Sequence, residues 1–309
     1  MTTKTRKGEM NMRIRKFLAV SLVGIMSLSM LTGCGSSNTE SSVDKKVLRV
    51  GMECAYPPFN WTQNEETLSD GTKAVKINGT NFYAYGYDVA VAQKLADEMG
   101  MELEIHKVEW NSIGMSLDSG EYDCIIAGMG KTAKREVSYA FTDVYYYRTN
   151  CLVVKKGSEY ESAKGLSDLA GKNVKVTTQL GTGWVDLLDQ IPDGQLGANY
   201  ETTSECFMAI QNGVADVCVI DLPTALAAQK TNPDLVIINL PDDDKFEGDE
   251  EMTNVCIATR KTDTEFRDKI QAAMDSIKWN NKDEMNALIE KWKKQLLDLG
   301  KQNRLHIAL

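Results

Sequence analysis

Arg135 lies in a stretch whose residue types suit the capture of an anion. The apolar run 124–127 is typical of a short buried strand, and the Gly128-Met129-Gly130 turn after it lets another backbone or a ligand come close. Thr132 can then cap a short turn of helix that carries Arg135. A guanidinium binds a carboxylate through two parallel hydrogen bonds, and the exposed amides of the turn add donors. The pattern predicts an anion site, with an arginine on a surface loop as the alternative.

The surrounding chain alternates apolar strand patterns with helical patterns. Strands are expected at 47–52, 103–108, 122–127, 151–155, 174–178, 217–220, 235–240 and 254–259. Helices are expected between them and as a closing pair at 263–279 and 282–299. This alternation predicts βαβ units on a parallel sheet, and hence an α/β fold. Ligands of such sheets bind beyond the carboxyl ends of the strands, which is where the Gly128 turn is expected.

Capping residues set the expected helix boundaries. Asp88 and Ser204 are predicted to cap helices that end near Gly100 and Gly213. The Gly181-Thr182-Gly183 segment opens another helix, and Pro223 suits the first turn of a helix that follows Asp221. Gly300 is predicted to stop the last helix.

The N-terminus has the pattern of an export signal. Six Lys and Arg residues precede 15 mostly apolar residues, 17–31, and the segment Leu31-Thr32-Gly33-Cys34 follows. The Leu-x-Gly-Cys pattern resembles a bacterial lipobox, which implies a signal peptide at 1–33 and a diacylglycerol on Cys34. An ordinary signal peptide with a coincidental cysteine is the alternative. Residues 34–46 are small and polar, which is typical of a flexible tether between the anchor and the fold. The expected location is therefore extracytoplasmic, on a membrane surface.

Charge narrows the range of partners. Residues 1–33 hold six Lys and Arg and one Glu, so the net charge changes from -9 for the whole chain to -14 for the expected mature chain. We expect no binding to nucleic acid by so acidic a protein, because binding to the phosphates requires clustered basic residues. The remaining residues suffice for two lobes with separate cores, although composition also allows one domain.

Cysteine spacing does not indicate a metal site. Six cysteines follow Cys34, with no CxxC pair, and four of them lie in apolar runs, so we expect reduced core residues, with disulfides as the alternative for an exported protein. The acidic segment 242–251 lacks the ligand order of an EF-hand and is interpreted as a solvated loop. We expect neither a metal nor a cofactor.

Five segments together resemble the solute-binding proteins of polar amino-acid ABC importers. They are RVGMECAYPPFN from Arg49, GYDVAVAQKLADEMG from Gly86, LGTGWVDLL from Leu180 and NGVADVCVIDLPTALA from Asn212, together with the stretch that begins with IIAGM at Ile125. That stretch continues through Thr132 and Arg135 to FTDVYYY from Phe141. The resemblance implies a type 2 periplasmic-binding-protein fold, in which two α/β lobes are joined by two crossing strands around a cleft. It implies one lobe from 47–147 plus 253–309 and another from 151–250. It further implies a monomer that takes an L-amino acid to a membrane permease with a separate ATPase.

The resemblance also implies roles for single residues. The carboxylate of the ligand would be held by Arg135 and by amides near Gly130 and Thr182, and its ammonium by Asp221 and the carbonyl group near Gly128. Tyr56 and Trp110 match positions that flank the ligand side chain, with core packing as the alternative, and Glu53 and Gln179 match specificity positions. The full predicted ligand-binding set is Glu53, Tyr56, Trp110, Gly128, Gly130, Thr132, Arg135, Gln179, Thr182, Gly183 and Asp221.

Some residues depart from that family pattern. Gly130 stands where a Ser or Thr usually supplies a hydroxyl, and residues 60–85 are longer than the usual hairpin, so we expect them to cover part of the cleft mouth. Glu53 suits arginine, lysine or histidine, and it also suits the amide of glutamine.

Two other function classes remain open. A dehydratase-like enzyme on the same fold would act on a small carboxylate, although the only histidines, His106 and His306, lie in no recognised motif. A sensory receptor domain would need a separate signalling partner.

Overall fold

The computed structural model describes residues 46–68, 70–248, 253–279 and 281–301. The predicted signal peptide, Cys34 and nearly all of the tether lie outside the described residues. Within the described part of the chain, no helix is both long enough and apolar enough to span a membrane.

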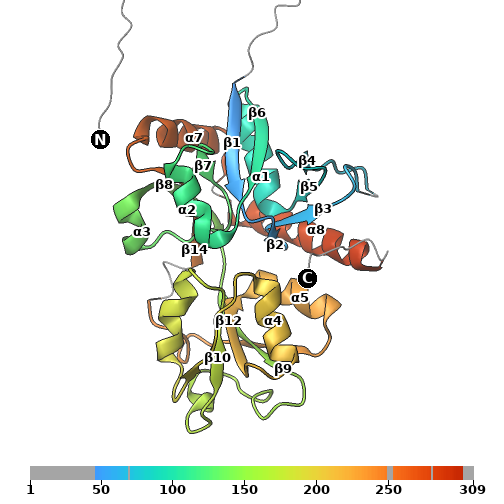
Figure 1. Cartoon of the computed structure of the whole chain (residues 1–309), viewed down its shortest axis with the longest axis vertical. Helices are drawn as coiled ribbons and strands as arrows, with labels where there is room; N and C mark the ends of the chain where they lie inside the picture. The colour runs from blue at the N-terminus through green and yellow to red at the C-terminus, as the bar shows by residue number, and fades with distance from the viewer. Residues whose placement is uncertain (1–45, 69, 249–252, 280, 302–309) are drawn as a thin grey trace, which may run out of the picture. The chain divides into compact units, whose positions relative to one another are not determined.

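One five-stranded sheet is built from both ends of the described chain. Its order is β6-β1-β7-β14-β8, in which β1 pairs in parallel with β6 and β7, and β14 pairs antiparallel with β7 and β8. The strands are β1 (Val47–Met52), β6 (Glu102–Lys107), β7 (Cys124–Ile125), β8 (Tyr139–Tyr147) and β14 (Asn254–Arg260). We call this sheet and its helices the first lobe (Figure 1).

Both faces of the first sheet are buried, as expected for a nearly parallel sheet. Side chains alternate between two cores: Cys124 and Ile126 belong to one cluster, and Ile125 and Ala127 to the other. The helices on the two faces are α1 (Tyr87–Glu98) and α7 (Thr264–Ser276) on one, and α2 (Ile113–Asp118), preceded by η1 (Trp110–Ser112), on the other.

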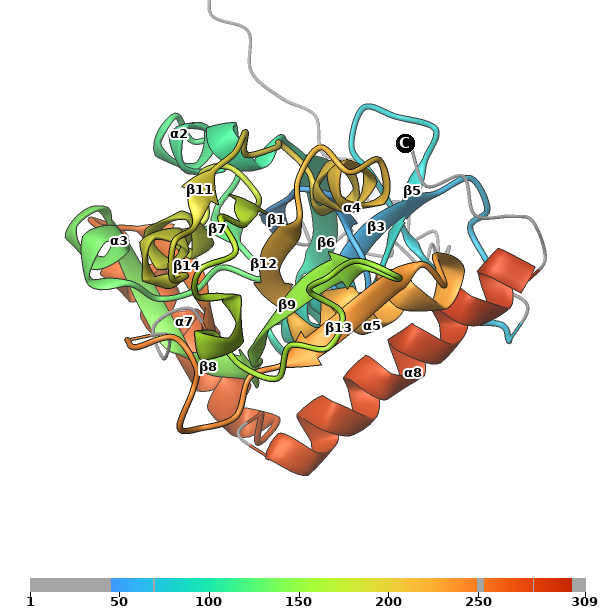
Figure 2. The same cartoon turned by 90° about the horizontal axis from the view of Figure 1, so that it is seen from below.

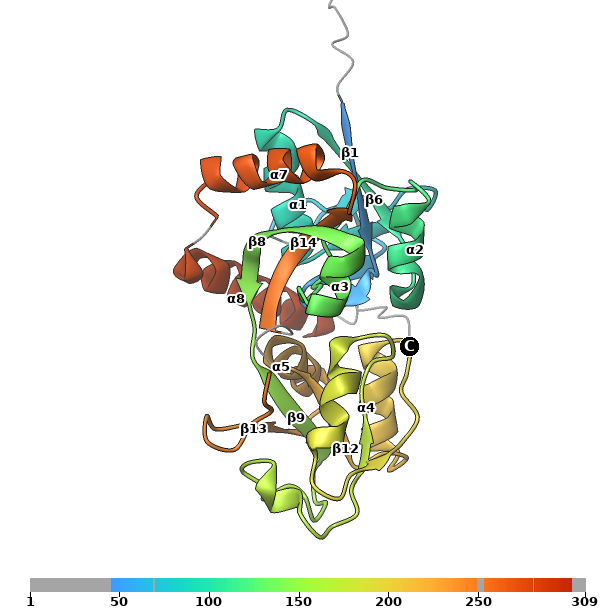
Figure 3. The same ribbon diagram turned by 90° about the vertical axis from the view of Figure 1, so that its left-hand side faces the viewer.

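A second five-stranded sheet has the order β11-β10-β12-β9-β13 and forms the second lobe. Its strands are β9 (Asn150–Lys155), β10 (Lys175–Thr177), β11 (Gln195–Leu196), β12 (Val217–Asp221) and β13 (Leu235–Asn239). Its helical segments are η2 (Ser167–Leu169), η3 (Gly183–Gln190), α4 (Thr203–Gln211) and α5 (Leu222–Thr231). The chain passes from β8 to β9 through Arg148 and Thr149 (Figure 3).

A small third sheet forms from the long segment after β1. Its strands are β2 (Ala55–Tyr56), β3 (Asn60–Gln63), β4 (Val75–Lys76) and β5 (Tyr83–Tyr85), in the order β2-β3-β5-β4. Trp61 and Tyr85 pack on Trp292 of α8 (Lys282–Lys301), with ring centroids 5.7 and 6.3 Å apart. Apolar packing therefore directs the insertion toward α8, and none of residues 60–85 lines the pocket described below. A cover over the cleft mouth stays a prediction.

Three expected helix boundaries were wrong. Helix α1 begins after Gly86, because Asp88 is buried in a hydrogen-bond network and does not cap it. Helix α4 begins after Thr202, whose hydroxyl forms a capping box with Glu205. Helix α8 continues through Gly300 to Lys301, and it runs alongside α5 (Figure 2).

The cysteines match their predicted state. All six cysteines in the described part of the chain are free and buried. They act as small apolar residues of the two lobes.

Candidate functional site

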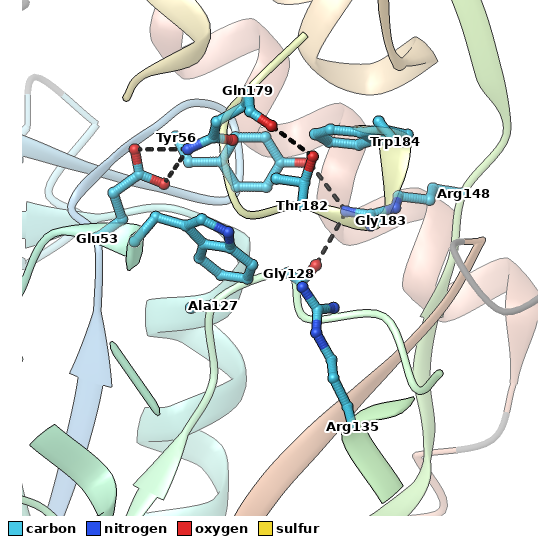
Figure 4. A pocket seen from close by; sticks show the side chains of 11 residues that line it. Glu53, Tyr56, Ala127, Gly128, Arg135, Arg148, Gln179, Thr182, Gly183 and Trp184 are labelled. Carbon is cyan, nitrogen blue, oxygen red and sulfur yellow. Dashed lines mark hydrogen bonds between the residues drawn. The ribbon is translucent and has the colours of Figure 1, made fainter. Parts of the chain in front are cut away.

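A pocket lies between the two lobes, at the carboxyl ends of β1, β7 and β10. From the first lobe it receives residues that follow β1 and β7, and from the second lobe residues that follow β10 and begin η3 (Figure 4). The lining residues are Glu53, Tyr56, Trp110, Ala127, Gly128, Arg135, Arg148, Gln179, Thr182, Gly183 and Trp184. The position agrees with the rule for ligands of open α/β sheets.

Eight of the eleven residues predicted from the sequence line this pocket, and the other three lie behind it. Gly130 contributes a carbonyl oxygen that accepts from Arg135, and Thr132 caps the helix that carries Arg135. Asp221 lies beneath the hydroxyl of Tyr56. These three residues therefore contact lining residues.

Arg135 projects into the pocket from α3 (Ala133–Ser138). The Thr132 hydroxyl accepts from the Arg135 amide at 3.1 Å, which starts the helix where the sequence predicts it. The guanidinium donates to the carbonyl oxygens of Gly130, at 2.9 Å, and Gly181, at 3.4 Å, and lies 5.4 Å from the ring centroid of Trp110. Burial lowers the pKa of Arg135 to about 10, and the nearby charge of Arg148 lowers it as well. Within the described residues, no carboxylate forms an ion pair with Arg135.

The Gly128 turn requires glycine. Its φ is +66°, and an added Cβ would lie 2.6 Å from the ring of Tyr56. The Gly128 amide donates to the Tyr145 hydroxyl at 2.9 Å, and that hydroxyl donates to Asp88 at 2.8 Å. Asn60 donates to the same carboxylate at 2.7 Å. Burial raises the pKa of Asp88 to about 6. This buried chain of hydrogen bonds fixes the amide side of the turn, so that the Gly128 carbonyl group faces the pocket.

Asp221 is a fully buried carboxylate at the end of β12. It caps α5 by accepting from the Thr224 amide at 2.9 Å, and Pro223 lies in the first turn as predicted. Its other oxygen accepts a hydrogen bond from the Tyr56 hydroxyl of the first lobe. Burial and the charge of Asp221 raise the pKa of Tyr56 well above its ordinary value, so this hydroxyl is a donor at neutral pH.

Glu53 and Gln179 meet across the cleft at the opposite end of the pocket. The Gln179 amide nitrogen lies 3.1 Å from both oxygens of Glu53. Burial raises the pKa of Glu53 to about 7, opposed by the hydrogen bond from Gln179. Thr182 donates its hydroxyl to the Gln179 carbonyl oxygen at 2.7 Å, which ties the start of η3 to this pair.

The sequence interpretation missed Arg148 and Trp184. Arg148 donates to the carbonyl oxygen of Gly128 at 2.9 Å and to the Tyr56 hydroxyl at 3.0 Å, and its guanidinium lies 4.9 Å from the ring centroid of Trp184. Trp184 belongs to the LGTGWVDLL segment. Arg148 directly follows FTDVYYY, and a charged residue at the end of an apolar strand was the available signal.

Little space remains among these side chains. The volume of the pocket that is open to the centre of a water molecule is about 20 Å³. One water needs roughly 10 to 15 Å³ of such volume. The side chains therefore nearly fill the cleft, and contacts between the lobes, Gln179 with Glu53 and Tyr56 with Asp221, hold it closed.

The chemistry of the pocket is recognition of charge. It holds two guanidiniums, a carboxylate of raised pKa and, behind Tyr56, a second carboxylate. His106 lies on β6 with Glu104 as its partner at 2.7 Å and does not line the pocket. Within the described residues, no cluster of His, Cys, Asp or Glu has the geometry of a metal site. The arrangement suits a small ligand that carries both charges.

Two α/β lobes around a charged cleft define a binding protein of the type 2 periplasmic-binding-protein fold. Residues 48–295 match the model of the bacterial extracellular solute-binding proteins, family 3, and the chain belongs to this family. The resemblance found in the sequence is thereby confirmed.

Relatives cover nearly the whole chain. The chain is 29% identical to the arginine-binding extracellular protein ArtP of Bacillus subtilis, over 90% of this chain and 98% of that protein. It is also 29% identical to the L-cystine-binding protein TcyJ of Escherichia coli K12, over 89% of this chain and 92% of that protein. A solved structure of an ancestral arginine-binding protein bound to arginine is similar with a TM-score of 0.62 and 29% identity, covering 80% of this chain and 98% of that one.

Proposed function

We propose that the protein captures an L-amino acid outside the cytoplasm and delivers it to an ABC importer. The observation that carries the proposal is the position of two opposite charges from different lobes: Arg135 lines the cleft, and Asp221 lies directly behind the Tyr56 hydroxyl that lines it. A zwitterion pairs its carboxylate with Arg135 and its ammonium with the Gly128 carbonyl oxygen and Asp221. The amino acids named for the relatives support the same ligand class.

Ligand binding favours closure because the two charges of the ligand are recognised by different lobes. A charge-assisted hydrogen bond contributes about 1.5 to 3 kcal/mol, and bonds completed only in the closed form shift the hinge equilibrium by their sum. We assign 47–147 with 253–309 to one lobe and 151–250 to the other. Bending at Arg148 and Thr149 then opens the cleft.

Glu53 and Gln179 are the proposed specificity residues. Their position at the end of the pocket opposite Asp221 suits the side chain of the ligand, with Trp110 beside it. An ionised Glu53 accepts hydrogen bonds from a guanidinium, an ammonium or a side-chain amide. The ligand is accordingly polar, and either basic or similar to glutamine.

Delivery requires a membrane permease with an ATPase on a separate polypeptide. A diacylglycerol on Cys34 holds the exported monomer at the membrane, and residues 34–46 act as the tether. An enzyme of the dehydratase kind is the second candidate. The pocket favours binding over turnover, because its ionisable groups are paired with each other and with backbone groups.

A thermal-shift panel of the twenty L-amino acids tests the proposal. The protein is first unfolded and refolded, which removes any bound ligand from the preparation. A ligand at 100 times its Kd stabilises the fold by about 2.7 kcal/mol, so one or a few amino acids should raise the Tm by several degrees. A flat panel on refolded protein would contradict the proposal. Turnover of a prephenate-like substrate would favour the enzyme.

A further inference from the structure

Arg148 occupies the part of the cleft where a ligand ammonium is expected. Its Nη1 atom donates to the Gly128 carbonyl oxygen at 2.9 Å and to the Tyr56 hydroxyl at 3.0 Å. The same hydroxyl donates to Asp221. Nη1 of Arg148 thus already contacts the Gly128 carbonyl oxygen and the Tyr56 hydroxyl, the groups that would otherwise receive the ligand ammonium.

The guanidinium is held in place by both lobes. Gly128 and Tyr56 belong to the first lobe, whereas Trp184, whose ring lies beneath the guanidinium, belongs to the second. The backbone of Arg148 is fixed as well, because its amide donates to the Thr253 carbonyl oxygen at 3.0 Å. The residue is 8% exposed. Such a contact stabilises the closed form in the same way as a bound cation would.

Space and charge exclude a ligand ammonium beside this side chain. With this guanidinium in place, the cleft offers about 20 Å³ to water centres, which is room for one or two waters. Arg135 and Arg148 point toward Gly128 from two sides (Figure 4), and the charge of Arg148 already lowers the pKa of Arg135. A third cation in the same place would meet repulsion from both.

We propose that Arg148 is an internal competitor for the ligand ammonium, so that an amino acid binds only when this guanidinium leaves Gly128 and Tyr56. The inference rests on the proposed function. It makes Arg148 a residue that sets affinity and selectivity. A carboxylate that lacks an ammonium binds Arg135 without competing with Arg148, whereas a full amino acid must displace Arg148.

Calorimetric titration of the refolded wild type, Arg148→Ala, Arg148→Gln and Arg148→Lys tests this proposal. The probes are L-arginine, L-glutamine and δ-guanidinovaleric acid, which is arginine without its α-amino group. Removing the guanidinium should raise the affinity for the bound amino acid roughly 10-fold or more, as expected if Arg148 vacates its acceptors in about a tenth of wild-type molecules. The Lys variant keeps a cation and should raise the affinity less. The affinity for δ-guanidinovaleric acid should not rise in any variant.

Two neutral variants are used to guard against a folding defect, because Arg148→Gln keeps part of the methylene stem that Arg148→Ala removes. Unchanged or weaker binding of the amino acid by both variants, with wild-type binding intact, would overturn the inference and leave the proposed function standing. Absence of binding to any L-amino acid by the wild type and by the variants would instead overturn the proposed function. Binding by the variants alone supports both.

Discussion

The Gln179 side-chain amide nitrogen lies 3.1 Å from each carboxylate oxygen of Glu53, and this contact joins the two lobes at one end of the cleft. The N–H groups of this amide need a hydrogen-bond acceptor, which the ionised carboxylate of Glu53 supplies best. Burial nevertheless raises the pKa of Glu53 to about 7. Near neutral pH both the neutral and the ionised form of the Glu53 carboxyl group are therefore populated. A basic ligand side chain would select the ionised form.

The first prediction is a pH dependence of ligand affinity. If the ligand side chain is cationic, its binding to the closed cleft requires ionised Glu53, so affinity should rise from pH 5.5 to about 7 and level off above it. In Glu53→Gln this rise should disappear. Calorimetric titration with L-arginine across that range measures it, and a pH-independent affinity in the wild type would exclude a cationic group at Glu53.

The stability of the ligand-free protein should change with pH in the opposite direction to the affinity. A carboxyl group whose pKa is raised from 4.5 to about 7 contributes its full stability below pH 4.5 and loses it as pH rises through 7. The wild type should therefore lose stability relative to Glu53→Gln between pH 5 and 8. Urea denaturation at several pH values compares the two.

The second prediction concerns Arg135. Arg135→Ala should weaken amino-acid binding roughly 100-fold, or by about 2.7 kcal/mol, because the ligand carboxylate would be buried without its partner. Lys134→Ala is the matched control, since Lys134 is the exposed neighbour on the same short helix. Equal affinities of the two variants in a calorimetric titration would show that Arg135 does not bind the ligand.

The third prediction separates the two roles of Asp221. Asparagine caps helices as well as aspartate does, so Asp221→Asn should keep α5. The Tm should fall only modestly, because the hydrogen bond from the Tyr56 hydroxyl loses its charged acceptor. The loss of charge should nevertheless weaken amino-acid binding roughly 100-fold. Asp216→Asn, just before the other end of β12, is the control. A large drop in Tm without a change in affinity would mean that Asp221 is only structural.

The fourth prediction concerns the buried support of the Gly128 turn. Tyr145→Phe removes the hydroxyl between the Gly128 amide and Asp88, leaving two buried groups without that partner. The free energy of unfolding should fall by about 1 to 3 kcal/mol, and ligand affinity should fall with it because the Gly128 carbonyl group loses its fixed position. Tyr147→Phe, two residues along β8 and 41% exposed, should change neither quantity. Urea denaturation measures the free energy of unfolding of both variants, and equal values for the two would contradict the prediction.

Local patterns predicted most of the fold. The α/β class, the strand before Gly128, the Thr132 cap and Pro223 in the first turn of α5 all depend on short stretches of sequence, and the structure agrees with them. Asp88 was mistaken for a cap because its partners, Asn60 and Tyr145, come from distant segments. Gly300 was mistaken for a stop because a single glycine is tolerated inside a long helix.

Arg148 could not be placed in the site from the sequence for a similar reason. Its acceptors, Gly128 and Tyr56, are 20 and 92 residues away along the chain. The folding of the first lobe brings these groups together, because Arg148 directly follows β8. Glu53 and Gln179 were placed by the family resemblance, and their mutual contact depends on the closed arrangement of both lobes.

The most direct test of amino-acid capture compares one ligand with its two singly charged analogues. Refolded protein is titrated in a calorimeter with the L-amino acid that stabilises it most, with the α-amide and with the des-amino acid; for arginine these are L-argininamide and δ-guanidinovaleric acid. Recognition of both charges predicts one site for the amino acid and roughly 100-fold weaker binding of each analogue. Equal affinity for either analogue would contradict the proposal that Arg135 and Asp221 together hold a zwitterion.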